Sequence, residues 1–338
     1  MRQCFSIGLF ALLVLSLPGC GGFRDTKPQL PGNLDTLCMP DYASGFEMYR
    51  YDSSTLLRIV NPWQGADSVS QWVFLSRDDE KPPKGFAGET IDVPVRRIVC
   101  MSSSYVAFLE ALGADSTICA ISGTGYIWSD KVRNRIARGE IAEAGFDNSL
   151  NFEKLVALKP DVVFLYGLTG KNAVTDKLHE LGLKTVYIGD YVENNPLGRA
   201  EWITVFGEFT GRRELASTLF DSISNEYNRA KALVSGVEKR PEVMLNAPWQ
   251  DSWFVPGDRS YMVRLLEDAG GNYACRGVDS DQSRPISTET AFVAASQSDF
   301  WLSPGTVTSL AELNAMNPRF GSIPPVRNGN VYNNNART

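Results

Sequence analysis

The sequence contains one histidine, His179, and six cysteines, none of them in a C-x-x-C pair. This scarcity excludes sites that need two or three imidazoles, such as H-E-x-x-H zinc hydrolases and histidine-rich metal carriers. The G-x-S-x-G motif of serine hydrolases is also missing. Basic residues are outnumbered, with 33 Lys and Arg against 39 Asp and Glu, which argues against binding to nucleic acid. We therefore expect no metal site and no cofactor.

Long hydrophobic runs are also missing, and the apolar stretch at residues 5–17 has only the length of a signal-peptide core. It ends in Leu17-Pro18-Gly19-Cys20, which resembles a bacterial lipobox. Residues 1–19 are thus expected to be a lipoprotein signal peptide, and acylated Cys20 to attach the chain to a lipid bilayer. The alternative is an ordinary secretory signal with an incidental cysteine.

The pattern of apolar residues divides the remaining chain into zones. Residues 20–44, which are rich in Pro and Gly, are typical of a tether, and residues 45–95 indicate a β-rich N-terminal extension. Residues 96–195 alternate short apolar strands with helices, which predicts a parallel sheet covered on both faces. Residues 196–238 predict a linking helical segment, and residues 239–338 return to alternation. The predicted class is α/β, with two Rossmann-like lobes joined by one long helix.

The two alternating halves contain a related motif. Glu153 follows Asn151-Phe152 in the first turn of a predicted helix, and an aspartate then leads the next strand. Glu289 has the same place in the second half, after Ser287-Thr288. Chance similarity is the alternative, because acidic residues favour helix N-termini in any protein.

With Leu112-Gly113-Ala114, Ala269-Gly270-Gly271 and the Asn330-Val331-Tyr332 strand, these motifs resemble the substrate-binding proteins of ABC importers for cobalamin, ferric siderophores and haem. The resemblance covers about residues 96–332. It implies a periplasm-facing receptor at the cell envelope that holds its ligand between two lobes. It also implies that Glu153 and Glu289 pair with arginines of an ABC permease in the cytoplasmic membrane. Members usually continue into a final helix, so the resemblance predicts a second lobe truncated at the C-terminus.

Loops that follow parallel strands form the ligand clefts of such folds. Clustered Tyr and Trp side chains in these loops suit a large, flat or amphipathic ligand. The candidates are Ser103, Ser104, Tyr105, Tyr126, Trp128, Tyr166, Tyr191, Trp249, Trp253 and Arg284. They leave a cobalamin-like, ferric-siderophore or haem ligand equally open.

We therefore predict a binding protein and not an enzyme. Two alternatives stay open at this point. One is a chelate-processing or chelatase-like enzyme on the same scaffold, and the other is a surface capture lipoprotein that works without a permease.

Overall fold

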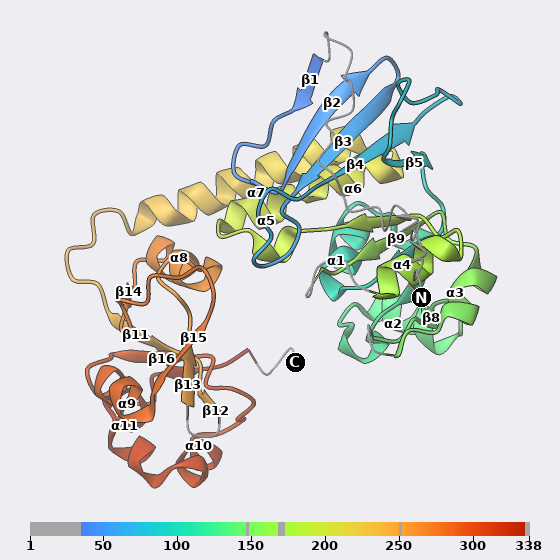
Figure 1. Ribbon diagram of the computed structural model, residues 1–338. Coiled ribbons are helices and arrows are strands. Elements are labelled where there is room, and N and C mark those ends of the chain that lie inside the picture. Colours follow the sequence, from blue (N-terminus) through green and yellow to red (C-terminus); the bar gives the residue numbers. More distant parts are fainter. Residues whose placement is uncertain (1–34, 147–148, 168–172, 250–251, 335–338) are drawn as a thin grey trace, which may run out of the picture.

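The computed structural model describes residues 35–146, 149–167, 173–249 and 252–334. Within these ranges the strands form four sheets, arranged in two lobes that a long helix connects (Figure 1). No helix found there has both the length and the apolar character needed to cross a membrane. The predicted signal peptide at residues 1–19 and Cys20 lie outside the described residues.

The first sheet is formed by the β-rich N-terminal residues and is mostly antiparallel, in the order β1-β2-β3-β4-β5. Its strands are β1 (Asp35–Cys38), β2 (Phe46–Tyr51), β3 (Ser54–Val60), β4 (Ser70–Ser76) and β5 (Glu89–Asp92). Met48, Leu57 and Val73 are buried in one hydrophobic core with Trp202 and Phe206, which lie more than 100 residues further along the chain. The sheet is therefore packed into the first lobe and does not form a separate body.

Residues 35–44 are held in place, although the sequence predicts a tether there. Strand β1 pairs with β2. The buried Glu201 carboxylate accepts hydrogen bonds of 2.7–2.9 Å from the backbone N–H groups of residues 41, 42 and 43. Glu193 accepts hydrogen bonds from the backbone N–H groups of Ser44 and Gly45. Two acidic side chains that are distant in the sequence thus fix the segment that enters β2.

The N-terminal lobe contains a fully parallel sheet in the order β10-β9-β6-β7-β8. Its strands are β6 (Ile98–Cys100), β7 (Ile118–Ile121), β8 (Ala142–Glu143), β9 (Val162–Leu165) and β10 (Thr185–Tyr187). The helices between them are α1 (Ser103–Ala111), α2 (Asp130–Ala137), α3 (Phe152–Leu158) and α4 (Ala173–Glu180). The central strands are wholly buried, as their continuous apolar sequences predict.

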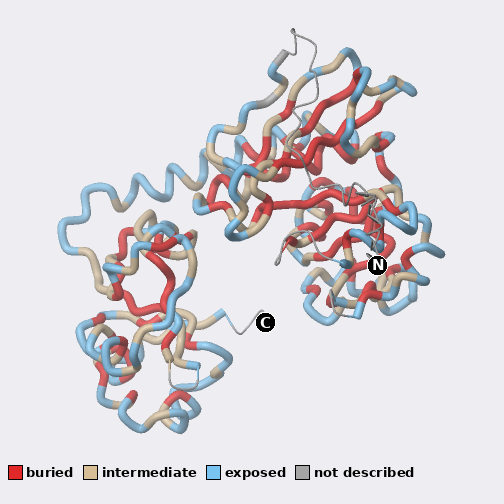
Figure 2. Tube along the Cα trace, viewed as in Figure 1, coloured by how far each residue is buried: buried red, intermediate tan, exposed pale blue. Residues whose placement is uncertain are grey.

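The linking segment consists of three helices: α5 (Pro196–Glu201), α6 (Ile203–Thr210) and α7 (Arg213–Leu233). Gly211, with φ of 69°, ends α6 in the left-handed conformation that glycine tolerates. Helix α7 has 21 residues and is therefore about 32 Å long. Its first half buries Ala216 and Phe220 in the N-terminal core, whereas its second half is largely exposed (Figure 2). Near its end, the Tyr227 hydroxyl donates a 2.9 Å hydrogen bond to Asp268 of the other lobe.

The C-terminal lobe contains a second parallel sheet in the order β14-β11-β16-β17. Its strands are β11 (Glu242–Leu245), β14 (Asn272–Tyr273), β16 (Phe300–Leu302) and β17 (Val331–Tyr332), and its helices are α8 (Tyr261–Asp268), α9 (Thr288–Ser296), α10 (Leu310–Met316) and α11 (Pro324–Arg327). A small antiparallel sheet, which the sequence pattern does not predict, is formed by β12 (Pro248–Trp249), β13 (Ser252–Val255) and β15 (Arg284–Ser287). Two parallel sheets, one long helix and a β-rich N-terminal sheet confirm the predicted fold class.

Candidate functional site

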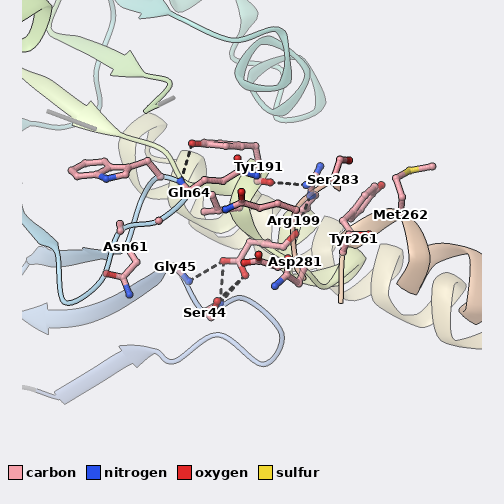
Figure 3. A pocket seen from close by; sticks show the side chains of 18 of the residues that line it. Ser44, Gly45, Asn61, Gln64, Tyr191, Arg199, Tyr261, Met262, Asp281 and Ser283 are labelled. Atoms are coloured by element: carbon pink, nitrogen blue, oxygen red, sulfur yellow. Dashed lines mark hydrogen bonds between the residues drawn. The ribbon is translucent and has the colours of Figure 1, made fainter. Parts of the chain in front are cut away.

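A cavity of about 520 Å³ lies between the two lobes, next to the linking helices (Figure 3). Three parts of the chain line it, and the parts from the two lobes are polar at most positions. The N-terminal sheet contributes Ser44, Gly45, Val60, Asn61, Trp63, Gln64, Gly65 and Ala66; the N-terminal lobe contributes Tyr191, Val192, Glu193, Asn194 and Arg199; the C-terminal lobe contributes Asn246, Pro256, Ser260, Tyr261, Met262, Asp281, Gln282 and Ser283. Its size falls within the range of small-molecule sites.

Arg199 connects the two lobes at this cavity. Its guanidinium lies 3.9 Å from the centre of the Tyr261 ring, a cation–π contact between α5 and α8. The same group donates hydrogen bonds to the backbone carbonyls of Tyr191, at 2.6 Å, and Glu193, at 3.1 Å. Arg199 lines the cavity, and because its Nε, one Nη and its face are engaged, it also joins the two lobes there.

Tyr191 and Tyr166 form an aromatic pair at the carboxyl ends of β9 and β10, with ring centres 4.3 Å apart. The Tyr191 hydroxyl donates a 2.7 Å hydrogen bond to the carbonyl of Gly167. Burial raises the pKa of Tyr191 to about 12, so its phenol is neutral at physiological pH. Tyr191, one of the predicted ligand contacts, lines the cavity, whereas Tyr166 is half-buried and does not.

Asp190 lies directly before Tyr191 and is almost completely buried. Burial raises the pKa of this carboxyl to about 6, although the Ser104 hydroxyl and the Arg199 guanidinium act in the opposite direction. Its Oδ1 atom has no hydrogen-bond partner among the described residues. The residue before the cavity-lining Tyr191 is thus a buried carboxyl group with a raised pKa.

A second hollow, of about 850 Å³, lies at the start of α1 and is more open. Ser103, Ser104, Tyr126 and Trp128 line it, and the two aromatic side chains are 70% and 54% exposed. The sequence predicts Ser103 and Ser104 in a loop, but they form the first turn of α1, because the Ser102 hydroxyl caps that helix through the N–H of Ser104. The four candidates are accessible to a solute.

Two candidates are structural and not ligand contacts. Tyr105 is fully buried, and its hydroxyl donates to the backbone carbonyls of Leu165 and Ile188. Trp253 is also fully buried, and its indole N–H donates a 3.2 Å hydrogen bond to the carbonyl of Leu245. These predictions are wrong because both side chains point into a core, where each polar atom finds a backbone acceptor.

The remaining ligand candidates lie on the small antiparallel sheet. Trp249 in β12 is 70% exposed, and Arg284 in β15 is exposed as well. Neither lines the two hollows described above. They stay candidates for contact with a ligand larger than the cavity itself.

Glu153 and Glu289 occupy equivalent positions in the two lobes. Each lies in the first turn of a helix, α3 and α9 respectively, and each is exposed. Side chains at the preceding caps, Asn151 and Ser287, accept hydrogen bonds from the first turns of these helices. Figure 1 shows the two helices in different lobes, both away from α7. Within the described part of the chain, neither carboxylate forms an ion pair.

The described residues contain no group of three His, Cys, Asp or Glu side chains that could hold a metal ion. Sequence reasoning missed the loop at residues 61–66 and the pair formed by Arg199 and Tyr261. The loop joins two strands of a segment that lies outside the repeating α/β pattern, and no motif marks it as part of a cleft. Only the packing of the N-terminal sheet against the lobe brings it there.

Comparisons with known proteins agree with this architecture. The model of the family described as periplasmic binding protein matches residues 98–338. An uncharacterized lipoprotein of Methanocaldococcus jannaschii is 26% identical over 366 residues, covering 98% of this chain and 87% of the relative. A second uncharacterized lipoprotein of that organism is also 26% identical and covers 91% of this chain and 78% of the relative.

Two solved structures share the fold. A periplasmic haem-binding protein of Vibrio cholerae has a TM-score of 0.59 at 18% identity, covering 71% of this chain and 90% of that one. A protein of an ABC-type Fe3+-hydroxamate transport system from Saccharomonospora viridis has a TM-score of 0.54 at 19% identity, covering 71% and 85%. The identities are low, so these structures establish the shared fold and not a shared ligand.

Proposed function

The chain belongs to the periplasmic binding protein family, the substrate-binding proteins of ABC transporters, and on that premise we propose that it binds an iron chelate, a haem or a cobalamin-like ligand and delivers it to a permease. Proteins of this family bind their ligands and are not enzymes. The observation that carries the proposal is the cavity between the lobes, lined from both sides at the carboxyl ends of parallel strands. This is where open α/β folds hold ligands.

Aromatic side chains around the cavity support a bulky ligand. Trp63, Tyr191 and Tyr261 line it, and Trp128 and Trp249 are exposed on either lobe. Aromatic faces bury a large area at low cost in conformational entropy. The binding test is a titration of the purified chain with cyanocobalamin, haem and several ferric siderophores, in which quenching of the tryptophan fluorescence reports binding. We expect saturable quenching by one class, and the absence of saturable quenching by every ligand would overturn the proposal.

Delivery to a permease is assigned to Glu153 and Glu289. Exposed carboxylates on two lobes form a two-point contact that orients a partner more than it tightens binding, since each solvated ion pair contributes at most about 1 kcal/mol. We expect the double variant Glu153→Lys and Glu289→Lys to abolish uptake into vesicles that contain the permease, with ligand affinity unchanged. Glu214→Lys is a matched control, because Glu214 is also an exposed glutamate in the first turn of a helix, α7. Loss of ligand affinity in the double variant would refute the docking role.

Membrane attachment is assigned to Cys20. The two curated relatives are named lipoproteins, which supports an acylated N-terminus facing the periplasm. Labelling cells with a radioactive fatty acid tests this directly. We expect label in the wild-type chain and none in Cys20→Ala.

A further inference from the structure

The loop at residues 61–66, between β3 and β4, forms a third wall of the interlobe cavity (Figure 3). Asn61, Trp63 and Gln64 from this loop line the cavity together with residues of the two lobes. The loop precedes residue 98, where the match to the family model begins. The two-lobed site common to the family therefore carries an additional surface in this chain.

This loop is held firmly against the N-terminal lobe. The Trp63 ring lies edge-on to Tyr187, with ring centres 5.1 Å apart. The backbone N–H of Gln64 donates a 3.4 Å hydrogen bond to the Tyr191 hydroxyl. At the base of the loop, the Asn61 N–H donates a hydrogen bond to the carbonyl of Val69, and the Val69 N–H donates one to the side-chain oxygen of Asn61. A wall fixed by these contacts is already in place before a ligand arrives, which lowers the entropic cost of binding.

The neighbouring strand β4 also holds the N-terminal sheet against the lobe. The Gln71 side chain donates a 2.8 Å hydrogen bond to the carbonyl of Thr185 and accepts a 2.9 Å hydrogen bond from the N–H of Tyr187, so it joins this sheet to β10. Gly167, after the end of β9, allows the Trp63 ring to lie close to the backbone, since a Cβ added at this glycine would be 3.2 Å from that ring. The loop is thus seated on the strand ends that supply Tyr191.

The charges around the cavity indicate what kind of ligand it accepts. Among the described lining residues, Arg199 is the only cation, and its guanidinium already bonds two carbonyls and covers Tyr261. Glu193 is buried and occupied by backbone N–H groups and the Trp202 indole. Asp281 is exposed and negative. The side chains of Gln64, Asn194 and Gln282 supply amide groups to the lining, whereas the Asn61 amide oxygen accepts a hydrogen bond from the Val69 N–H and the Asn246 amide donates one to the carbonyl of Phe254. An anionic ligand would meet two carboxylates and a single guanidinium here, whereas amide or hydroxamate groups would meet donors and acceptors.

We infer that this loop is a specificity-determining wall of the ligand site, and that Gln64 selects ligands whose periphery is uncharged and carries amide or hydroxamate groups. The inference rests on the proposed function. Gln64 is exposed, and its side chain extends from a loop that the surrounding contacts hold in place. A changed charge at this position should therefore act on the ligand and not on the fold.

The experiment titrates the full mature chain and three variants, Gln64→Ala, Gln64→Glu and Gln64→Lys. Two probes are uncharged, cyanocobalamin and a neutral ferric trihydroxamate, and two are anionic, haem and a ferric catecholate. Gln297→Ala is the control, because Gln297 is an exposed glutamine at the end of α9, outside the cavity lining. Thermal unfolding of each variant checks the fold.

We expect the wild type to prefer an uncharged probe. Gln64→Ala should bind it about tenfold more weakly, the effect of losing one hydrogen bond to the ligand. Gln64→Lys should move the preference toward the anionic probes, Gln64→Glu should move it further away, and Gln297→Ala should leave it unchanged. A wild type that prefers an anionic probe, or Gln64 variants that bind as the wild type does, would overturn the inference and leave the proposed function standing. A wild type that binds no probe would overturn both.

Discussion

Replacing Asp190 by asparagine is expected to stabilise the protein at neutral pH and to remove one source of the pH dependence of its free energy of unfolding. Asp190 is 6% exposed, and burial raises its pKa from the ordinary aspartate value of 3.8 to about 6. The folded state therefore holds this proton more tightly than the unfolded state does. As pH rises from about 4 to 6, the unfolded chain loses the proton first, so the free energy of unfolding falls and then levels off above the folded pKa.

The magnitude follows from the two pKa values. At about 1.4 kcal/mol for each tenfold difference in proton affinity, the gap between 3.8 and about 6 corresponds to about 3 kcal/mol. An asparagine keeps the shape of the side chain and has no charge to bury. We therefore expect Asp190→Asn to raise the free energy of unfolding by up to about 3 kcal/mol at pH 7.5 and by little at pH 4.

The assay is denaturant unfolding of the wild type and Asp190→Asn at several pH values between 4 and 8. Asp221→Asn serves as a control, because Asp221 is an exposed aspartate on α7. The quantity to compare is the difference in the free energy of unfolding between variant and wild type at each pH, since the other groups titrate equally in both. Parallel pH profiles for the wild type and Asp190→Asn would refute the reasoning.

Further predictions concern the core, the buried carboxylates and the linking helix. Glu201→Ala should lower the free energy of unfolding by about 3 kcal/mol, because three backbone N–H groups lose their acceptor; an unchanged denaturation midpoint would contradict this. Glu208 is buried, which raises its pKa, but hydrogen bonds from Arg213 and Thr55 outweigh burial and the net pKa is lowered. Its stabilisation should therefore be present above pH 4.5 and lost as pH falls through the lowered pKa, so pH titrations of stability for the wild type and Glu208→Gln should converge in acid. Trp253→Ala should cost about 3–5 kcal/mol as a core truncation, with ligand affinity of the folded protein unchanged; weaker binding at equal stability would restore Trp253 as a ligand contact. Small-angle scattering should show little compaction on ligand binding, because α7 links the lobes as one rod, and a large compaction would contradict this.

The sequence predicts those parts of the fold that depend on local patterns. Continuous apolar runs such as residues 162–165 are buried strands of parallel sheets, and the long periodic segment after Arg212 is α7. The break between α5 and α6 was not predicted, because no glycine or proline lies at Trp202. The small antiparallel sheet was missed for a similar reason, since strands of two to four residues are too short for an alternating pattern.

The site was predictable only in part, because composition does not reveal the direction of a side chain. Tyr105 and Trp253 are aromatic residues of the expected kind, but they lie within α1 and β13 respectively, and both point into a core. Trp63 and Gln64 belong to a segment more than 120 residues before Tyr191, and only the folded sheet brings them together. Contacts of this kind depend on tertiary packing, for which a single sequence contains no local signal.

The most direct test of the central claim is a crystal structure of the chain in complex with the ligand that binds most tightly in the titration. We expect one ligand between the lobes, in contact with Gln64 and Tyr191 on one side and Tyr261 on the other. A ligand bound elsewhere, with the interlobe cavity occupied only by solvent, would contradict the account.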